Sequence, residues 1–121
     1  MVGIGGAIGS CLRYGLARAT LQLGWLFPLG TLLANVIAGL GIGFVLGMEA
    51  QAFCITPRAK IFLNTGLMGG LSTFSTFSWE TIRLYSEGNH LLAVGNVVLN
   101  LSLSLLGVVL GMALAKMIKK A

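Results

Sequence analysis

The side chains in this sequence that could do chemistry are uncharged hydrogen-bond donors set within long apolar stretches. They are Asn35, the hydroxyls of residues 72–78, Asn96, Asn100, Ser102 and Ser104. Each can donate a hydrogen bond without carrying a charge, which suits an anion as the ligand. We expect no Asp, Glu or Lys within the same stretches, whereas a proton-coupled pump or a cation-exchanging transporter normally carries an ionisable residue there. The pattern favours an anion and disfavours coupled transport.

Two aromatic rings, Phe74 and Phe77, stand three residues apart within the hydroxyl-rich run. A phenyl ring has a positive edge and a negative face, so an anion is attracted to the edge and a cation to the face. A pair with this spacing is also typical of ordinary packing. The rings are therefore candidates for an anion pathway, with packing as the other interpretation.

The hydroxyl-rich run also interrupts an apolar segment, because Gly66, Gly69 and Gly70 come shortly before it. A helix broken at membrane depth is tolerated only where its backbone is buried in protein or lines a cavity. The free N–H groups and the positive dipole end at the start of the second half-helix favour negative charge. The sequence thus predicts a broken helix beside an anion site.

The elements that must position these groups are membrane-spanning helices. Of the 121 residues, 56% are hydrophobic and only 9% are charged, which leaves too little polar surface for a soluble domain. A span takes roughly 20 mostly apolar residues, so the chain holds at most four. We predict a single all-α integral membrane domain over residues 1–121, with spans at 1–23, 29–48, 61–85 and 91–117 and the third span broken.

Polar and aromatic residues mark the boundaries between the spans. Trp25 and Pro28 separate the first two spans, and residues 49–60 form a polar connection between the second and the third. The last boundary is marked by Glu80, Arg83, Glu87 and His90. The opening residues carry no basic segment before the apolar run, so we expect the first span to be retained.

Small and polar residues repeat along single faces of two spans. The second span carries Asn35, Gly39, Gly43 and Gly47 at a spacing of four, which puts them on one helix face. Such a stripe of small residues lets another helix approach closely. The fourth span has a comparable polar face, made by Asn96, Asn100 and Ser104.

The charged residues fit a membrane protein better than a nucleic-acid-binding one. The formal net charge is +5, but three of the eight cations cluster at the C-terminus: Lys116, Lys119 and Lys120. Lysine-rich flanks are typical of a cytoplasmic membrane interface, so we interpret them as an anchor. Arg13 lies deeper in the first span and should pair with backbone carbonyls or line a wet cavity.

The residues that often build enzyme or metal sites are sparse. Cys11 and Cys54 form no CxxC motif or Cys/His cluster, so we interpret both as free thiols, in neither a disulfide nor a metal site. His90 has no partner at the spacing of a triad or a metal site and is expected at the surface. We therefore expect no enzyme activity.

Three segments resemble motifs of one family of membrane proteins. Residues 69–77 read GGLSTFSTF, which closely resembles the GGLTTFSTF signature of the Fluc (CrcB-type) fluoride channels. Residues 30–35, GTLLAN, are similar to that family's GTLxxN segment, and residues 9–14, GSCLRY, resemble its arginine-bearing first helix. The resemblance covers essentially the full length. It implies a fluoride-selective channel that exports fluoride passively across the cell (plasma) membrane and relieves fluoride toxicity.

The resemblance also implies an antiparallel homodimer with dual topology and two fluoride pathways. The family's pathway residues match Phe74, Phe77, Asn35, Ser75 and Thr76, and helical periodicity adds Asn100 and Ser104. The main-chain carbonyls of Gly69 and Ser72 match the family's site for a structural Na⁺ ion at the dimer centre, and Arg13 matches its first-helix arginine. Ser72 replaces a commoner threonine but keeps the hydroxyl and the carbonyl.

Two other functions remain open from the residues alone. A small four-helix multidrug-type exporter would need a glutamate in the first span, whereas the acidic residues here are Glu49, Glu80 and Glu87. A non-transporting membrane assembly subunit could use the same glycines and asparagines only to join helices. The GGLSTFSTF run argues against this second alternative.

Overall fold

The computed structural model describes residues 2–24, 27–50 and 55–120. Trp25, Cys54 and the side chains of Lys119 and Lys120, on which the sequence made predictions, lie outside the described residues. All regular structure within the described ranges is helical, which confirms the all-α class. The elements are α1 (Val2–Leu21), α2 (Leu29–Ala50), α3 (Pro57–Lys60), the π-helix η1 (Ile61–Met68), α4 (Gly69–Leu71), α5 (Phe74–Ser86) and α6 (His90–Lys120).

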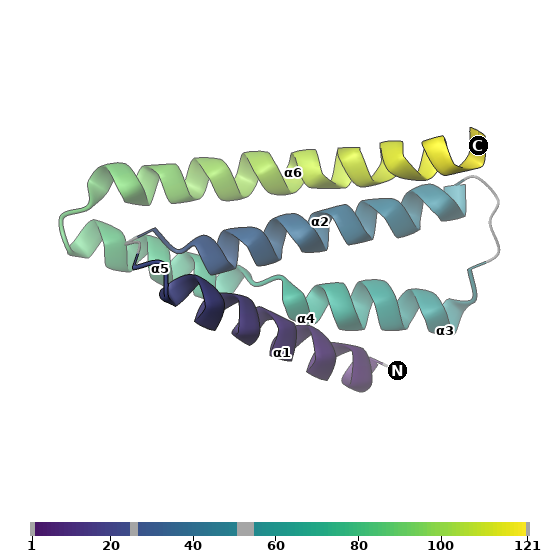
Figure 1. The fold of residues 1–121 in the computed structure, drawn as a ribbon, viewed down its shortest axis with the longest axis horizontal. Helices are drawn as coiled ribbons and strands as arrows, with labels where there is room; N and C mark the ends of the chain where they lie inside the picture. The colour runs from purple at the N-terminus through teal and green to yellow at the C-terminus, as the bar shows by residue number, and fades with distance from the viewer. Residues whose placement is uncertain (1, 25–26, 51–54, 121) are drawn as a thin grey trace.

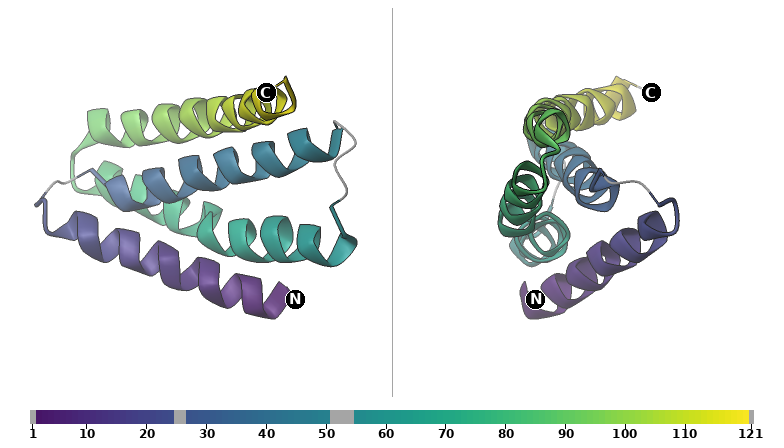
Figure 2. Two further views of the ribbon diagram at one scale, coloured as in Figure 1. Left: turned by 45° about the vertical axis from the view of Figure 1, so that its right-hand side comes forward. Right: turned by 90° about the vertical axis from the view of Figure 1, so that its left-hand side faces the viewer.

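The helices form an elongated bundle. Figure 1 shows α2 and α6 side by side along its length, with α1 and the stretch from α3 to α4 beneath them. Both views of Figure 2 keep α2 next to α6, and the left view has the two chain ends toward the same end of the bundle. That arrangement follows from an even number of passes of the chain along the bundle.

Three helices begin and end within three residues of the predicted spans: α1, α2 and α6. The stretches Leu29–Glu49 and His90–Ile118 are long and apolar enough to cross a membrane, with mean hydropathies of 2.1 and 2.3. α1 has 20 residues, among them Arg13 and Arg18. By length and composition, α2 and α6 are therefore the candidate membrane helices in the described ranges.

The helical segments on either side of residues 72 and 73 are separate. Ser72 (φ −79°, ψ 154°) and Thr73 (φ −153°, ψ 128°) are extended, and they divide the continuous helical stretch of α3, η1 and α4 from α5. The Thr73 hydroxyl accepts a hydrogen bond from the Thr76 N–H at 3.3 Å, which caps the N-terminus of α5. The predicted third span, 61–85, thus corresponds to two helical pieces with a link of two residues.

The small-residue stripe on α2 faces α6; the sequence predicted a close helix contact at this stripe without naming the partner helix. A Cβ added at Gly39 would lie 2.7 Å from the Ser104 carbonyl oxygen, and one at Gly47 would lie 2.8 Å from the Ala115 Cβ. An added Cβ at Gly43 would overlap the carbonyl oxygen of Val108. The two backbones therefore approach more closely than side chains at these positions would allow.

α1 packs in the same manner on η1 and α4. A Cβ added at Gly5 would lie 2.6 Å from the Phe62 carbonyl oxygen, and one at Gly70 would lie 2.7 Å from the Gly6 carbonyl oxygen. The π-helix η1 ends at this contact, where the Gly69 N–H donates to the carbonyls of Asn64 and Gly66. A π-helix is rare and is frequently found at functional sites. The glycines thus hold α1 beside the start of the extended link.

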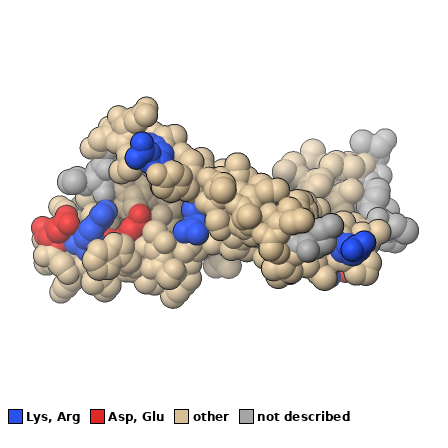
Figure 3. Space-filling view, turned by 90° about the horizontal axis from the view of Figure 1, so that it is seen from below, with Lys and Arg blue, Asp and Glu red and all other residues tan. Residues whose placement is uncertain are grey.

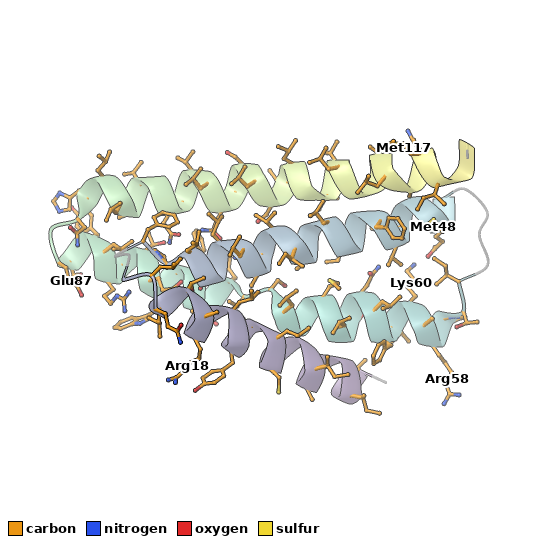
Figure 4. The ribbon with its side chains drawn as sticks, in the orientation of Figure 1. Arg18, Met48, Arg58, Lys60, Glu87 and Met117 are labelled. Atoms are coloured by element: carbon orange, nitrogen blue, oxygen red, sulfur yellow. The ribbon has the colours of Figure 1, made fainter. Side chains whose placement is uncertain are left out.

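The charged side chains are distributed toward the ends of the molecule. In Figure 4, Arg18 and Glu87 lie at one end, and Arg58 and Lys60 lie at the other. The face in Figure 3 is mostly uncharged, with blue and red atoms in its left half, one blue group close to the middle, and a further group toward the right-hand end. Lys60 pairs with Glu49 at 3.1 Å, but both side chains are exposed, so the pair contributes little stability.

Candidate functional site

A groove of about 330 Å³ lies between α2, α5, α6 and the extended link. Five of the seven predicted pathway residues line it, from three separate parts of the chain: Asn35, Phe74, Phe77, Asn100 and Ser104. Ser72 and Thr73 also line it, and its remaining lining is apolar. The fold thus brings the neutral donors and both rings to one surface.

Ser75 and Thr76, the other two predicted pathway residues, do not line this groove. Because each helical residue turns by about 100°, they project from other sides of α5 than Phe74 and Phe77, which are three residues apart. The Ser75 hydroxyl lies 3.3 Å from that of Thr73 and is exposed. Thr76 lines a separate pocket together with Arg13 and Glu80.

The two phenylalanine rings contact each other at the groove. Their centroids are 5.6 Å apart and their planes are inclined by 59°, which is the tilted arrangement that aromatic pairs prefer. Phe77 is buried, with 8% of its surface exposed, whereas Phe74 is 75% exposed. The chain therefore holds Phe77 firmly and leaves most of Phe74 uncovered.

Asn35 joins α2 to the extended link through both ends of its amide. Its Oδ1 accepts a hydrogen bond from the Thr73 N–H at 2.9 Å. Its Nδ2 donates to Asn100 Oδ1 at 2.9 Å and to the Thr73 carbonyl at 3.4 Å. Asn35 Oδ1 replaces the helical acceptor that the Thr73 N–H lacks, so this side chain stabilises the interruption between α4 and α5.

Asn96, which the sequence grouped with the polar face of the fourth span, is completely buried next to Asn100. The Asn100 Nδ2 donates to the carbonyl oxygen of Asn96 at 2.9 Å and to its Oδ1 at 2.8 Å. These donors point along α6 and away from Asn35. The spacing of four residues correctly predicted that the two asparagines share a face.

Arg13 bonds a backbone carbonyl, as the sequence predicted for a deep arginine. Its Nε donates to the Gly70 carbonyl oxygen at 3.2 Å, across the contact between α1 and α4. The carbonyls at the end of a helix have no intrahelical partner. The charged donor thus satisfies one of them and fixes the end of the helical stretch before the link.

The carbonyls of Gly69 and Ser72 are the chain's candidates for a cation. In a continuous helix they would accept from the N–H groups of Thr73 and Thr76. Here these groups donate to Asn35 Oδ1 and Thr73 Oγ1. Unwound backbone carbonyls are the kind of oxygen that coordinates Na⁺ in membrane proteins. The donor set fits a monovalent cation, although one chain supplies only two such oxygens.

Glu80 is a candidate that the sequence interpretation misplaced. We grouped it with the residues that mark the end of the third span, although the predicted range 61–85 already contains it, and the structure has it within α5, which ends at Ser86. Its half-buried side chain lines a second pocket of about 330 Å³ with Arg13, Thr31 and Thr76. Its spacing of four residues from Thr76 was the available signal, because residues four apart share a helix face.

The comparisons with known proteins agree with these motifs. Residues 1–112 match the sequence profile of the family described as "CrcB-like protein, Camphor Resistance (CrcB)". The fluoride-specific ion channel FluC of Clostridium novyi (strain NT) is 47% identical over 119 residues, which are 98% of this chain and 93% of the relative. A protein of the same name from Pyrococcus abyssi (strain GE5 / Orsay) is 46% identical over 113 residues, covering 93% and 91% of the two chains.

Proposed function

The chain belongs to the CrcB-like protein family, and on that premise we propose that it is a fluoride-selective ion channel through which fluoride leaves the cell passively. Such a leak relieves fluoride toxicity. The groove carries this proposal, because it combines uncharged donors with two phenyl rings, the edges of which attract anions. As a member of an ion-channel family the chain is not an enzyme.

Conduction requires that the groove replace the water around the ion without holding the ion too tightly. Asn35 and Ser104 supply neutral donors, and Phe74 and Phe77 supply positively polarised edges. None of the residues that line the groove is ionisable, so the groove itself offers no site for coupling to protons. Passive flow down the fluoride gradient is the mechanism that these residues support.

The chain crosses the plasma membrane four times in this proposal, and its third crossing is interrupted at Ser72 and Thr73. A single protomer would leave the link beside lipid, where backbone polar groups cannot find partners. Large apolar side chains on α5 are also exposed, with Phe74 at 75% and Trp79 at 62%. A second copy, inserted in the opposite orientation, would cover this face and complete a dual-topology homodimer with two pathways.

A structural Na⁺ ion belongs to the same dimer. The Gly69 and Ser72 carbonyls of two copies would supply four oxygens to it at the centre. The physical reason is that carbonyls deprived of their helical donors cost a few kcal/mol each when they are kept from water. A cation compensates several of these oxygens at once and raises the local potential for an entering anion.

Liposomes provide the direct test of fluoride conduction. The purified protein is reconstituted, and fluoride and chloride efflux are followed with ion-selective electrodes in the absence of a proton gradient. We expect rapid fluoride efflux and little chloride efflux. Efflux that requires a proton gradient, or that passes chloride equally, would contradict the proposed function.

The alternatives have less support. A multidrug-type exporter needs an acidic residue in its first membrane helix, and α1 contains none among Val2–Leu21. Glu80, the half-buried acid, lies on α5 instead. A non-transporting assembly subunit has no use for a groove lined by donors and ring edges. The liposome assay separates both alternatives from a channel.

A further inference from the structure

The hydrogen bonds that begin at Asn35 continue beyond the groove and return to α5. The Asn96 Nδ2 donates to the Thr81 Oγ1 at 2.8 Å, and the Thr81 hydroxyl donates to the Phe77 carbonyl oxygen at 2.8 Å. Asn96 and Thr81 do not line the groove. The network therefore starts at Thr73, passes through α2 and α6, and ends at Phe77, one turn further along α5.

Both ends of this network have a fixed polarity. The Thr73 N–H can only donate, and the Phe77 carbonyl can only accept. Thr81 gives its single hydrogen to Phe77 and so must accept from Asn96. Consequently Asn96 turns its oxygen to Asn100, and Asn100 turns its oxygen to Asn35. Counting donors and acceptors from the Thr73 end or from the Phe77 end gives the same orientation for the amide of each asparagine. The hydrogen-bond network itself therefore assigns these orientations.

This orientation decides what Asn35 offers to an ion in the groove. One Asn35 hydrogen is held by Asn100 Oδ1 at 2.9 Å, and the other reaches the Thr73 carbonyl at 3.4 Å. A bond of 3.4 Å is beyond the usual range for N–H···O, so this hydrogen is easily given to an ion in the groove instead. A reversed amide would present an acceptor instead, which would repel an anion.

We propose that Thr81 and Asn96 are positioning residues for fluoride selectivity, which act from outside the groove by fixing the direction of the Asn100 and Asn35 amides. The inference rests on the proposed function, because it concerns which ion that groove selects. Thr81 fixes one end of the network. Its hydroxyl donates its only hydrogen to the Phe77 carbonyl oxygen, so the hydroxyl oxygen can only accept a hydrogen bond from Asn96. Loss of that hydroxyl leaves an Asn96 donor buried without its acceptor.

Ser78 belongs to the hydroxyl-rich run but does not line the groove, so it provides a matched control on the same helix. Its hydroxyl donates to the Phe74 carbonyl at 2.9 Å, the same bond from residue i to residue i−4 that Thr81 makes. Among the described residues, however, no asparagine bonds to Ser78. Removal of either hydroxyl changes α5 locally in the same way, but only removal of the Thr81 hydroxyl disturbs the amide chain.

The test uses wild type, Thr81→Val, Thr81→Ser and Ser78→Ala, reconstituted in liposomes with fluoride and chloride electrodes. Because an unpaired buried donor favours reversal of the Asn96 amide, Thr81→Val should lower fluoride flux about tenfold and lower the ratio of fluoride to chloride flux. Thr81→Ser keeps the hydroxyl and should retain both values. Ser78→Ala should also retain them.

Wild-type flux and selectivity in folded Thr81→Val would overturn the inference, as would an equal loss in Ser78→Ala. If Thr81→Val does not yield a monodisperse protein, Thr81→Ala removes the same hydroxyl without placing a methyl group against Asn96 and is judged by the same criteria. Absence of fluoride flux in wild type would instead overturn the proposed function and this inference together.

Discussion

Phe74 and Phe77 line the same groove but differ in how much of each ring the rest of the chain covers. Replacement of either ring by Ile keeps an apolar side chain and removes the positively polarised edge. We expect Phe74→Ile and Phe77→Ile each to reduce fluoride flux by about tenfold or more, which corresponds to roughly 1.4 kcal/mol in the barrier. Liposome efflux with a fluoride electrode measures this.

Phe74→Ile and Phe77→Ile should differ in their free energy of unfolding. Phe77 is buried, so its replacement should also cost about 1 kcal/mol of unfolding free energy, whereas exposed Phe74 should cost the protomer less. Phe44→Ile is the matched control, because Phe44 lines a different pocket with Val45 and Met48. Wild-type flux through a folded Phe74→Ile or Phe77→Ile dimer would mean that the edge of that ring does not bind the ion.

Residue types, spacing and the family resemblance predicted five of the side chains that line the groove, but they also included Ser75 and Thr76, which do not line it, and they did not predict how the amide hydrogens point. Asn35, Asn100 and Ser104 were identified because polar residues are rare in apolar helices. The amide directions depend on Thr81, which lies 46 residues after Asn35 in the sequence and carries no signal of its own. Glu80 was misplaced because it stands near Arg83 and Glu87, a grouping typical of a helix end.

The contact between α2 and α6 determines the width of the groove, because both helices supply its walls. Gly43→Ala puts a methyl group against the Val108 carbonyl and forces the helices apart. We expect a loss of about 1–3 kcal/mol in the free energy of unfolding, as is typical of overpacking. The thermal midpoint in detergent measures it.

Gly95→Ala on α6 is the control for this prediction. A Cβ at Gly95 has no atom within 4 Å, so only the helix propensity changes. Alanine is better than glycine in a helix by about 1 kcal/mol, and the variant should be as stable as wild type or slightly more so. An unchanged midpoint in Gly43→Ala would mean that α2 and α6 can separate at no cost.

The sequence predicted the helices better than the interruption between α4 and α5. Apolar length was enough to locate α1, α2 and α6 within three residues. The link is two residues long, and it depends on Asn35 and the Thr73 hydroxyl capturing N–H groups that a helix would otherwise use. Glycine and hydroxyl content could indicate the region, but the residues of the link depend on these tertiary bonds.

The distribution of positive charge over the whole chain bears on its orientation in the membrane. The end that holds the α2–α3 connection and the C-terminus carries five cations, Arg58, Lys60, Lys116, Lys119 and Lys120, against three in the other half, Arg13, Arg18 and Arg83. Arg13 is bonded to the Gly70 carbonyl inside the protomer. A small difference in loop charge fixes orientation only weakly, so we expect insertion both ways.

Cysteine labelling in intact cells tests the dual topology. Cys11 and Cys54 are replaced by Ser, a single cysteine is added at the C-terminus, and a membrane-impermeant maleimide is applied. We expect a substantial fraction of C-termini to be labelled and the rest to be protected. Additional lysines at the C-terminus should increase the protected fraction, because positive flanks stay inside. Protection of every C-terminus, or labelling of every one, would exclude an antiparallel dimer.

In the proposed dimer the cation would connect the two copies of the chain, so its removal should affect the whole molecule. Because Na⁺ would bind the folded dimer and not the unfolded chain, the thermal midpoint should rise with Na⁺ concentration and stay constant with N-methylglucamine. Fluoride flux should fall when Na⁺ and all small substitutes are removed over a long incubation. Both readouts are compared at equal ionic strength.

Ser72→Ala distinguishes a main-chain site from a hydroxyl site. The substitution keeps the Ser72 carbonyl and removes only the side-chain oxygen, so the dependence of the thermal midpoint on Na⁺ should equal that of wild type. The carbonyls of Gly69 and Ser72 remain available in the variant because their usual N–H partners still donate to Asn35 and to the Thr73 hydroxyl. Loss of the Na⁺ effect in Ser72→Ala would assign the ligand to the hydroxyl. If neither the fluoride flux nor the thermal midpoint of the wild type depended on any cation, ordered water rather than an ion would satisfy these oxygens.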